Sequence, residues 1–202
     1  MMKLTEIKLK KHVKLSKNEI NALPLIQYEG DIEILTSKDN IQAAINDLKN
    51  YDLIGFDTET KPTFVKGPLN PPSIMQLACD DKVYIFQFDN DEIFKQLSLI
   101  LSNKNITKCG VSVDRDLIEL MYLSPFDPIS FVDLGNVARE NEIPHHGLRG
   151  LVAMFLKHRI SKGSQTSDWS RISLSDAQIS YAATDAWVSL ELFKIFDKNG
   201  LL

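Results

Sequence analysis

The sequence predicts an α/β fold in which helices cover both faces of a mixed β-sheet. Strand-like segments come first along the chain, and strands then alternate with helices, as is typical of such a sheet. The 202 residues suffice for one well-buried domain and are too few for two large ones. With 44% hydrophobic and 25% charged residues, the composition is that of an ordinary globular protein.

The N-terminal half is predicted to contain an arm, four strands and one long helix. Residues 1–29 form the arm and a short helix, because Ser16-Lys17-Asn18-Glu19 has the form of a capping box and Pro24 ends the helix. Apolar residues alternate over 31–35, as in a half-buried strand, and then recur at helical spacing over 41–48. Further strands are expected at about 52–58, 73–79 and 83–88.

Helices and strands alternate in the C-terminal half, and we expect one folded domain over residues 30–202. Strands are predicted at about 106–113 and 129–132. Helices are predicted at about 91–102, 115–122, 133–140, 147–156 and 175–197, with a polar loop at 160–173 before the last one.

Composition excludes several classes of protein. The net charge of −4 argues against a binder of polyanions that acts through bulk charge, although six lysines among the first 17 residues form a local basic segment. No apolar run approaches the roughly 18 residues of a membrane span, and the N-terminus lacks the apolar stretch of a secretory signal, so we expect a cytoplasmic protein. Cys79 and Cys109 are expected to be reduced core residues, since one pair fits neither a zinc site nor a disulfide framework.

Two carboxylates follow an apolar strand in the segment IGFDTETKP. Because side chains alternate along a strand, Asp57 and Glu59 point to the same side of the sheet as Gly55. The same spacing recurs in Asp31-Ile32-Glu33, so a D-x-E pair alone is weak evidence of a site. Two acids exposed to water at a strand end remain the alternative at this point.

A third acid, Asp185, lies in a final helix that is apolar over most of its circumference. A buried carboxylate takes up a proton or binds a cation, unless a backbone group donates a hydrogen bond to it. Tyr181 lies one turn earlier on the same face, so its hydroxyl and this carboxylate address one volume. A fourth acid is Asp114 or Asp116 in the helix after strand 106–113, where one of the two is alternatively an exposed acid at the helix N-terminus.

Taken together, these motifs resemble the DEDD 3′–5′ exonucleases, in the branch that includes ribonuclease D and the exonuclease domain of the Werner syndrome helicase. That family carries D-x-E at a strand end, an Asp after a later strand and Y-x-x-x-D on the last helix. The matching residues here are Asp57-Thr58-Glu59, Asp116 and Tyr181-Ala182-Ala183-Thr184-Asp185. Asp116 is chosen over Asp114 because an apolar residue, Leu117, follows it directly, as in the family.

The last motif is the most specific part of the resemblance. The segment SDWSRISLSDAQISYAATDAW is especially similar to the family, and Ser180 stands where the other subclass has histidine, which makes this the tyrosine type. The resemblance covers about residues 30–197. It implies a ribonuclease H-like fold with a mixed five-stranded sheet, and an exonuclease domain over residues 30–202.

The resemblance also implies a site for two Mg²⁺ or Mn²⁺ ions about 4 Å apart. Asp57 would bridge both ions, and Glu59 and Asp185 would complete the ligands of the ion on the nucleophile side. Asp116 would hold the other ion through water, and Tyr181 would orient the attacking water.

The implied reaction is hydrolysis of nucleic acid from single-stranded 3′ ends, with release of nucleoside 5′-monophosphates. We expect DNA rather than RNA as the substrate, since the chain has neither the extra helical domains of ribonuclease D nor a helicase. The alternatives are ribonuclease D-like trimming of RNA 3′ ends and a catalytically inactive module that binds nucleic acid. The inactive module predicts loss of at least one site residue, whereas all five are present.

The sequence indicates the residues that contact the substrate less specifically than it indicates the catalytic residues. The candidates are Thr58, Phe64 and Lys162, of which Phe64, in the proline-rich loop after Glu59, would stack on the terminal base. The lysine-rich residues 1–17 form either an extra edge strand or an arm that binds nucleic acid. A further basic group either touches phosphates or forms a solvated face: Arg149, Lys157, Arg159 and Lys162. Three histidines are expected to be loop or surface residues rather than metal ligands: His145, His146 and His158.

Overall fold

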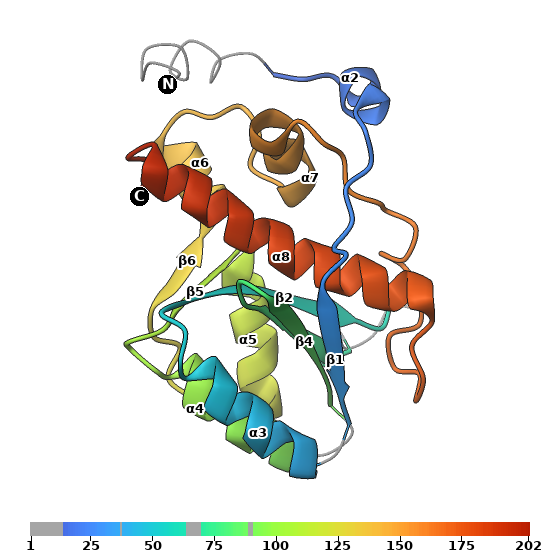
Figure 1. Ribbon diagram of the computed structural model, residues 1–202, viewed down its shortest axis with the longest axis vertical. Helices are drawn as coiled ribbons and strands as arrows, with labels where there is room; N and C mark the ends of the chain where they lie inside the picture. The colour runs from blue at the N-terminus through green and yellow to red at the C-terminus, as the bar shows by residue number, and fades with distance from the viewer. Residues whose placement is uncertain (1–13, 37, 64–69, 89–90) are drawn as a thin grey trace.

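The computed structural model describes residues 14–36, 38–63, 70–88 and 91–202. They form one mixed sheet with helices on both faces (Figure 1). The strands are β1 (Asp31–Leu35), β2 (Leu53–Thr60), β3 (Pro72–Ala78), β4 (Lys82–Gln87), β5 (Thr107–Gly110) and β6 (Phe131–Asp133). The helices are α2 (Lys17–Ala22), α3 (Lys38–Leu48), α4 (Asp91–Leu101), α5 (Val113–Leu123), α6 (Leu134–Glu140), α7 (Leu148–Leu151) with its π-helical continuation η1 (Val152–Leu156), and α8 (Asp176–Lys198).

The strand order is β1-β4-β3-β2-β5-β6. The β2, β3 and β4 strands form an antiparallel meander, whereas β1 joins β4, β5 joins β2 and β6 joins β5 in parallel. The predicted α/β class with a mixed sheet is therefore confirmed. All six strands predicted from the residue pattern are present, including the short strand expected at 129–132, which is β6. The five-stranded sheet implied by the family resemblance is therefore one strand too few.

One boundary prediction is wrong for a local reason. The predicted strand 106–113 is too long, because β5 ends at Gly110 and the chain turns at Ser112, which has a left-handed backbone with φ of 67°. Helix α5 therefore begins at Val113, two residues earlier than predicted. A Cβ at Gly110 would lie 2.6 Å from the carbonyl oxygen of Phe56, so the turn passes close to β2 only because this residue is glycine.

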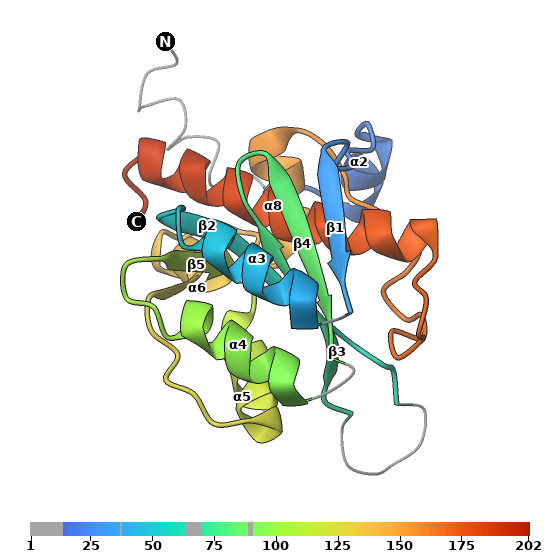
Figure 2. The ribbon, with the colours of Figure 1, turned by 60° about the horizontal axis from the view of Figure 1, so that its bottom comes forward.

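Helices pack on the two faces of the sheet as separate layers (Figures 1 and 2). Helices α3, α4 and α5 cover one face, where their apolar side chains share a core with the strands. Helix α8 crosses the other face, and its alanines Ala182, Ala183 and Ala186 pack on β3 and β4. Both cysteines lie in the core, buried and free, in agreement with the prediction. Among the described residues, no helix combines the length and apolar character needed to span a membrane.

Helix α8 lies unusually close to β2 because of Gly55. A Cβ at this position would lie 2.1 Å from the carbonyl oxygen of Ala186. Any other residue would therefore push the helix away from the strand. Gly55 shares its face of the sheet with Asp57, so this close approach brings Asp185, the residue before Ala186, next to the end of β2.

The described part of the N-terminal segment packs on the C-terminal half of the chain. The predicted capping box of α2 is confirmed, since Ser16 and Glu19 bond reciprocally to each other's backbone N–H. Leu25 forms a parallel bridge with Arg159, and the Tyr28 N–H donates to Thr184 Oγ1 at 3.0 Å. The boundary at residue 30 stays a prediction, and most of the lysine-rich arm, residues 1–13, lies outside the described residues.

Candidate active site

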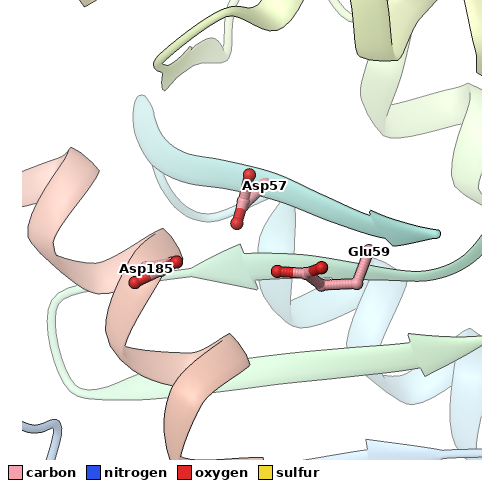
Figure 3. A group of neighbouring side chains, drawn as sticks. All are labelled: Asp57, Glu59 and Asp185. Atoms are coloured by element: carbon pink, nitrogen blue, oxygen red, sulfur yellow. The ribbon is translucent and has the colours of Figure 1, made fainter. Parts of the chain in front are cut away.

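Three carboxylates converge between the end of β2 and the middle of α8. Oxygen atoms of Asp57, Glu59 and Asp185 all lie within 4.8 Å of one another. Figure 3 shows the three side chains pointing into one space between the strand and the helix. The alternation along β2 aims the first two acids at α8, and the close approach at Gly55 brings the third to them.

Asp116 lies on the first turn of α5 and lines the same cleft as these three acids. It is not a member of the 4.8 Å group, but its charge raises the pKa of both Asp57 and Glu59. Asp114 is exposed and accepts a hydrogen bond from Asn136 Nδ2 at 3.1 Å. Of the two acids that the sequence offered here, the structure therefore brings Asp116 to the cleft.

Tyr181 lies one helical turn before Asp185 and lines the same cleft. Its side chain is 9% exposed, and its ring packs against Trp169 at a centroid distance of 5.9 Å. Burial raises the pKa of the phenol above its ordinary value, and the nearby charges of Asp185, Glu59 and Asp57 raise it further. The phenol therefore stays protonated and can donate a hydrogen bond into the cleft.

Burial and mutual repulsion dominate the electrostatics of the acids. Burial raises the pKa of Asp57 well above its ordinary value, and the charges of neighbouring acids raise it further. The same two causes raise the pKa of Glu59 to about 9. Burial raises the pKa of Asp185 to about 7, although a hydrogen bond with the Tyr181 side chain acts to lower it. Burial also raises the pKa of Asp116 to about 7, although a hydrogen bond with the Thr58 side chain acts to lower it. Without a counter-charge, these carboxylates disfavour being ionised together.

The donor set fits hard divalent cations. All four groups are carboxylates, and oxygen ligands are those that Mg²⁺ and Mn²⁺ prefer. Asp185 is 5% exposed, and its Oδ1 has no hydrogen-bond partner among the described residues, which disfavours the alternative of a carboxylate bonded to the backbone. A cation would supply both the missing partner and the missing counter-charge.

These side chains open into a cleft of about 700 Å³. Two of the predicted substrate contacts, Thr58 and Lys162, line it, whereas Phe64 lies outside the described residues. His145 lines it too, but its Nε2 accepts a hydrogen bond from the Leu15 N–H at 2.9 Å, and it is not part of the acidic cluster.

Sequence reasoning did not single out Gln76, which lies within the strand predicted at 73–79. Gln76 pairs directly with Asp57 across the antiparallel strands, so both side chains lie on the α8 face. It is fully buried, and neither its amide nitrogen nor its amide oxygen has a hydrogen-bond partner among the described residues. The available signal was an amide within an otherwise apolar strand.

The chain is similar in sequence to known exonucleases. A family model described as 3′–5′ exonuclease matches residues 32–200. The bifunctional 3′–5′ exonuclease/ATP-dependent helicase WRN of Mus musculus is 30% identical over 182 residues, which cover 85% of this chain and 13% of the mouse protein. Ribonuclease D of Haemophilus influenzae is 26% identical over 189 residues, which cover 91% of this chain and 46% of that protein. The chain therefore spans less than half the length of either relative.

Solved structures show the same fold. The Nibbler EXO domain of Aedes aegypti matches with a TM-score of 0.77 at 26% identity, over 86% of this chain and 92% of that domain. The catalytic core of RRP6 from Trypanosoma brucei matches in fold with a TM-score of 0.75 at 17% identity, over 98% of this chain and 56% of that one. These matches confirm the predicted ribonuclease H-like architecture. With the family match over most of its length, the chain belongs to the 3′–5′ exonuclease family.

Proposed function

We propose that this chain is a metal-dependent 3′–5′ exonuclease of the tyrosine subclass, which releases nucleoside 5′-monophosphates from the 3′ end of a nucleic-acid strand. The observation that carries the proposal is the convergence of Asp57, Glu59 and Asp185 within 4.8 Å in a cleft that Asp116 and Tyr181 also line. An inactive module that only binds nucleic acid is the weaker alternative, because such a module has no need to keep buried acids that repel one another.

The four carboxylates would hold the metal. Asp57, Glu59 and Asp185 would hold one ion, and Asp57 and Asp116 would hold the other. When bound, two Mg²⁺ or Mn²⁺ ions would activate a water molecule and stabilise the charge on the leaving 3′ oxygen.

Tyr181 is proposed to position the attacking water. Its raised pKa supports a donor role, because a protonated phenol can hold water by a hydrogen bond but cannot act as a strong base. Its position one turn from Asp185 places the hydroxyl beside the acids.

We propose DNA as the preferred substrate. The proposal is supported by 26% identity over 163 residues to the DNA polymerase I of Aquifex aeolicus. Trimming of RNA 3′ ends is the second candidate, favoured by the similarity to ribonuclease D. Carboxylates that hold metal act on the phosphodiester and do not read the 2′ position, so the acids leave the choice open.

The test is degradation of matched DNA and RNA 12-mers that carry a label at the 5′ end. In Mg²⁺ or Mn²⁺ we expect stepwise shortening from the 3′ end, and in excess chelator none. Asp57→Ala should abolish turnover, whereas Asp31→Ala, in the D-x-E triplet of β1, is the matched control and should leave it unchanged. Full activity in chelator, or products of internal cuts, would contradict the proposal.

A further inference from the structure

The basic side chains that line the catalytic cleft differ in their partners. Arg115 pairs with Glu119 at 2.8 Å, so its charge is already compensated. Arg149 and Lys162 also line the cleft, and neither forms an ion pair within the described part of the chain. Lys162 is exposed to water, whereas Arg149 is half-buried. Arg149 is therefore the cleft cation whose charge is least well compensated.

The contacts of Arg149 leave its guanidinium incompletely bonded. One terminal nitrogen donates to Oδ1 of Asn21, which is a neutral acceptor. Its Nε is buried and has no hydrogen-bond partner among the described residues. The half-buried guanidinium has no anion beside it among the described residues, and a phosphate offers both the charge and a pair of oxygen acceptors that a guanidinium fits.

Asn21 belongs to a segment that precedes the part of the chain matched by the exonuclease family. That match begins at residue 32, whereas α2 ends at Ala22. Even so, Ile20 of α2 lines the catalytic cleft. The helix therefore forms part of the cleft wall although it lies outside the matched domain.

Several contacts between distant residues fix α2 against the segment that carries Arg149. The N–H of Leu15 donates to His145 Nε2 at 2.9 Å, 130 positions along the chain. After the helix, the Ile26 N–H donates to the Arg159 carbonyl and the Arg159 N–H to the Pro24 carbonyl, both at 2.9 Å. These contacts hold Asn21 in place as the acceptor for Arg149.

We propose that Arg149, positioned by Asn21 of α2, binds a backbone phosphate of the substrate strand, so that the segment before the family domain completes the substrate site. The inference rests on the proposed function, since it takes the strand in this cleft to be the substrate of the acids. Arg149 contributes to binding of the strand, and the acids and Tyr181 carry out the chemistry.

The test compares Arg149→Met, Arg149→Lys and Asn21→Ala with a matched control, Arg139→Met. Arg139 also donates to an asparagine, Asn136, but it is exposed and does not line the cleft. Alanine favours helix more than asparagine does, so Asn21→Ala removes the acceptor while keeping α2. The probe is a single-stranded DNA 12-mer with a 5′ fluorophore. Its Kd is measured by anisotropy in chelator across a salt series, and its KM and kcat are measured in Mg²⁺.

Arg149→Met should raise Kd and KM about tenfold, as expected for loss of a hydrogen bond to a charged group, with kcat within about twofold of the wild type. The slope of log Kd against log salt should fall by about 0.7, the value for one phosphate neutralised on a single strand. Arg149→Lys should restore the slope but only part of the affinity. Asn21→Ala should raise KM a few-fold without changing the slope, because the charge remains.

If Arg149→Met binds and turns over the 12-mer like Arg139→Met, the inference is overturned while the exonuclease proposal stands. If the wild type binds the 12-mer in a manner that depends on Arg149 but never shortens it, the inference stands and the exonuclease proposal fails. If the wild type neither binds nor shortens this 12-mer or the RNA 12-mer of the same sequence, both are overturned.

Discussion

Replacing Asp185 by asparagine should make the metal-free protein more stable at neutral pH. Burial raises the pKa of this carboxyl from its ordinary 3.8 to about 7. Each unit of difference between the folded and unfolded pKa is worth about 1.36 kcal/mol, so keeping Asp185 ionised costs the folded state about 4 kcal/mol. Asparagine has nearly the same shape and carries no charge. Because 1 kcal/mol shifts Tm by about 2–4 °C in a chain of this size, Asp185→Asn should raise Tm by about 8–16 °C at pH 8 in chelator.

The pH dependence of this difference has a definite sign. The folded-state pKa is raised, so the protonated carboxyl stabilises the folded protein below about pH 4, and this contribution is lost as the pH rises to about 7. The wild type should therefore approach the stability of Asp185→Asn as the pH falls from 7 to 4. Divalent metal should narrow the difference, because ligand at 100 times its Kd stabilises the wild type by about 2.7 kcal/mol, which offsets most of the cost of about 4 kcal/mol, and the variant lacks one ligand.

The assay is thermal unfolding of both proteins in chelator and in Mn²⁺ at several pH values. Asp197→Asn, at the exposed C-terminal end of the same helix, is the control and should change stability by no more than about 0.5 kcal/mol. An Asp185→Asn variant that is no more stable than the wild type at pH 8 in chelator would show that the buried charge of Asp185 does not destabilise the folded protein. So would a stability difference that stays constant between pH 4 and pH 8.

Three further predictions address the remaining parts of the site. Tyr181→Phe should lower kcat about 10²-fold while keeping the stabilisation by Mn²⁺, and a variant with full kcat would remove its role in positioning water. Gln76→Met should raise the free energy of unfolding by about 1 kcal/mol, because it removes a buried amide that has no hydrogen-bond partner among the described residues. It should also lower kcat several-fold if the amide supports Asp57, the residue opposite it on β2. An unchanged kcat would show that Gln76 has a structural role only. Deleting residues 1–14 should weaken binding of single strands and flatten its dependence on salt, by about 0.7 for each phosphate that the arm neutralises, with kcat preserved. If plots of log Kd against log salt have the same position and slope for the full and the truncated protein, the arm does not bind substrate.

Local rules made part of the site predictable from the sequence. Alternation along a strand gives the shared direction of Asp57 and Glu59, and the apolar surroundings of Asp185 indicate that it is buried. The choice between Asp114 and Asp116 needed the family motif, because both lie on the first turn of one helix. Only the packing shows which of the two reaches the cleft.

Other features depend on contacts between residues far apart in the sequence, which periodicity does not specify. The approach of α8 to β2 depends on Gly55 meeting the backbone of Ala186, and the wall of the cleft depends on Asn21 meeting Arg149, 128 positions later. The missing partners of Gln76 likewise become visible only when the strands are paired.

Asp57, Glu59, Asp116 and Asp185 are together proposed to form a site for divalent metal that acts on a nucleotide. The most direct measurement is anomalous diffraction from crystals of the full chain soaked with Mn²⁺ and a nucleoside 5′-monophosphate. We expect two manganese peaks, one among Asp57, Glu59 and Asp185 and one between Asp57 and Asp116, with the phosphate of the nucleotide beside them. Manganese that is absent from these carboxylates, or bound elsewhere while they remain empty, would contradict this proposal.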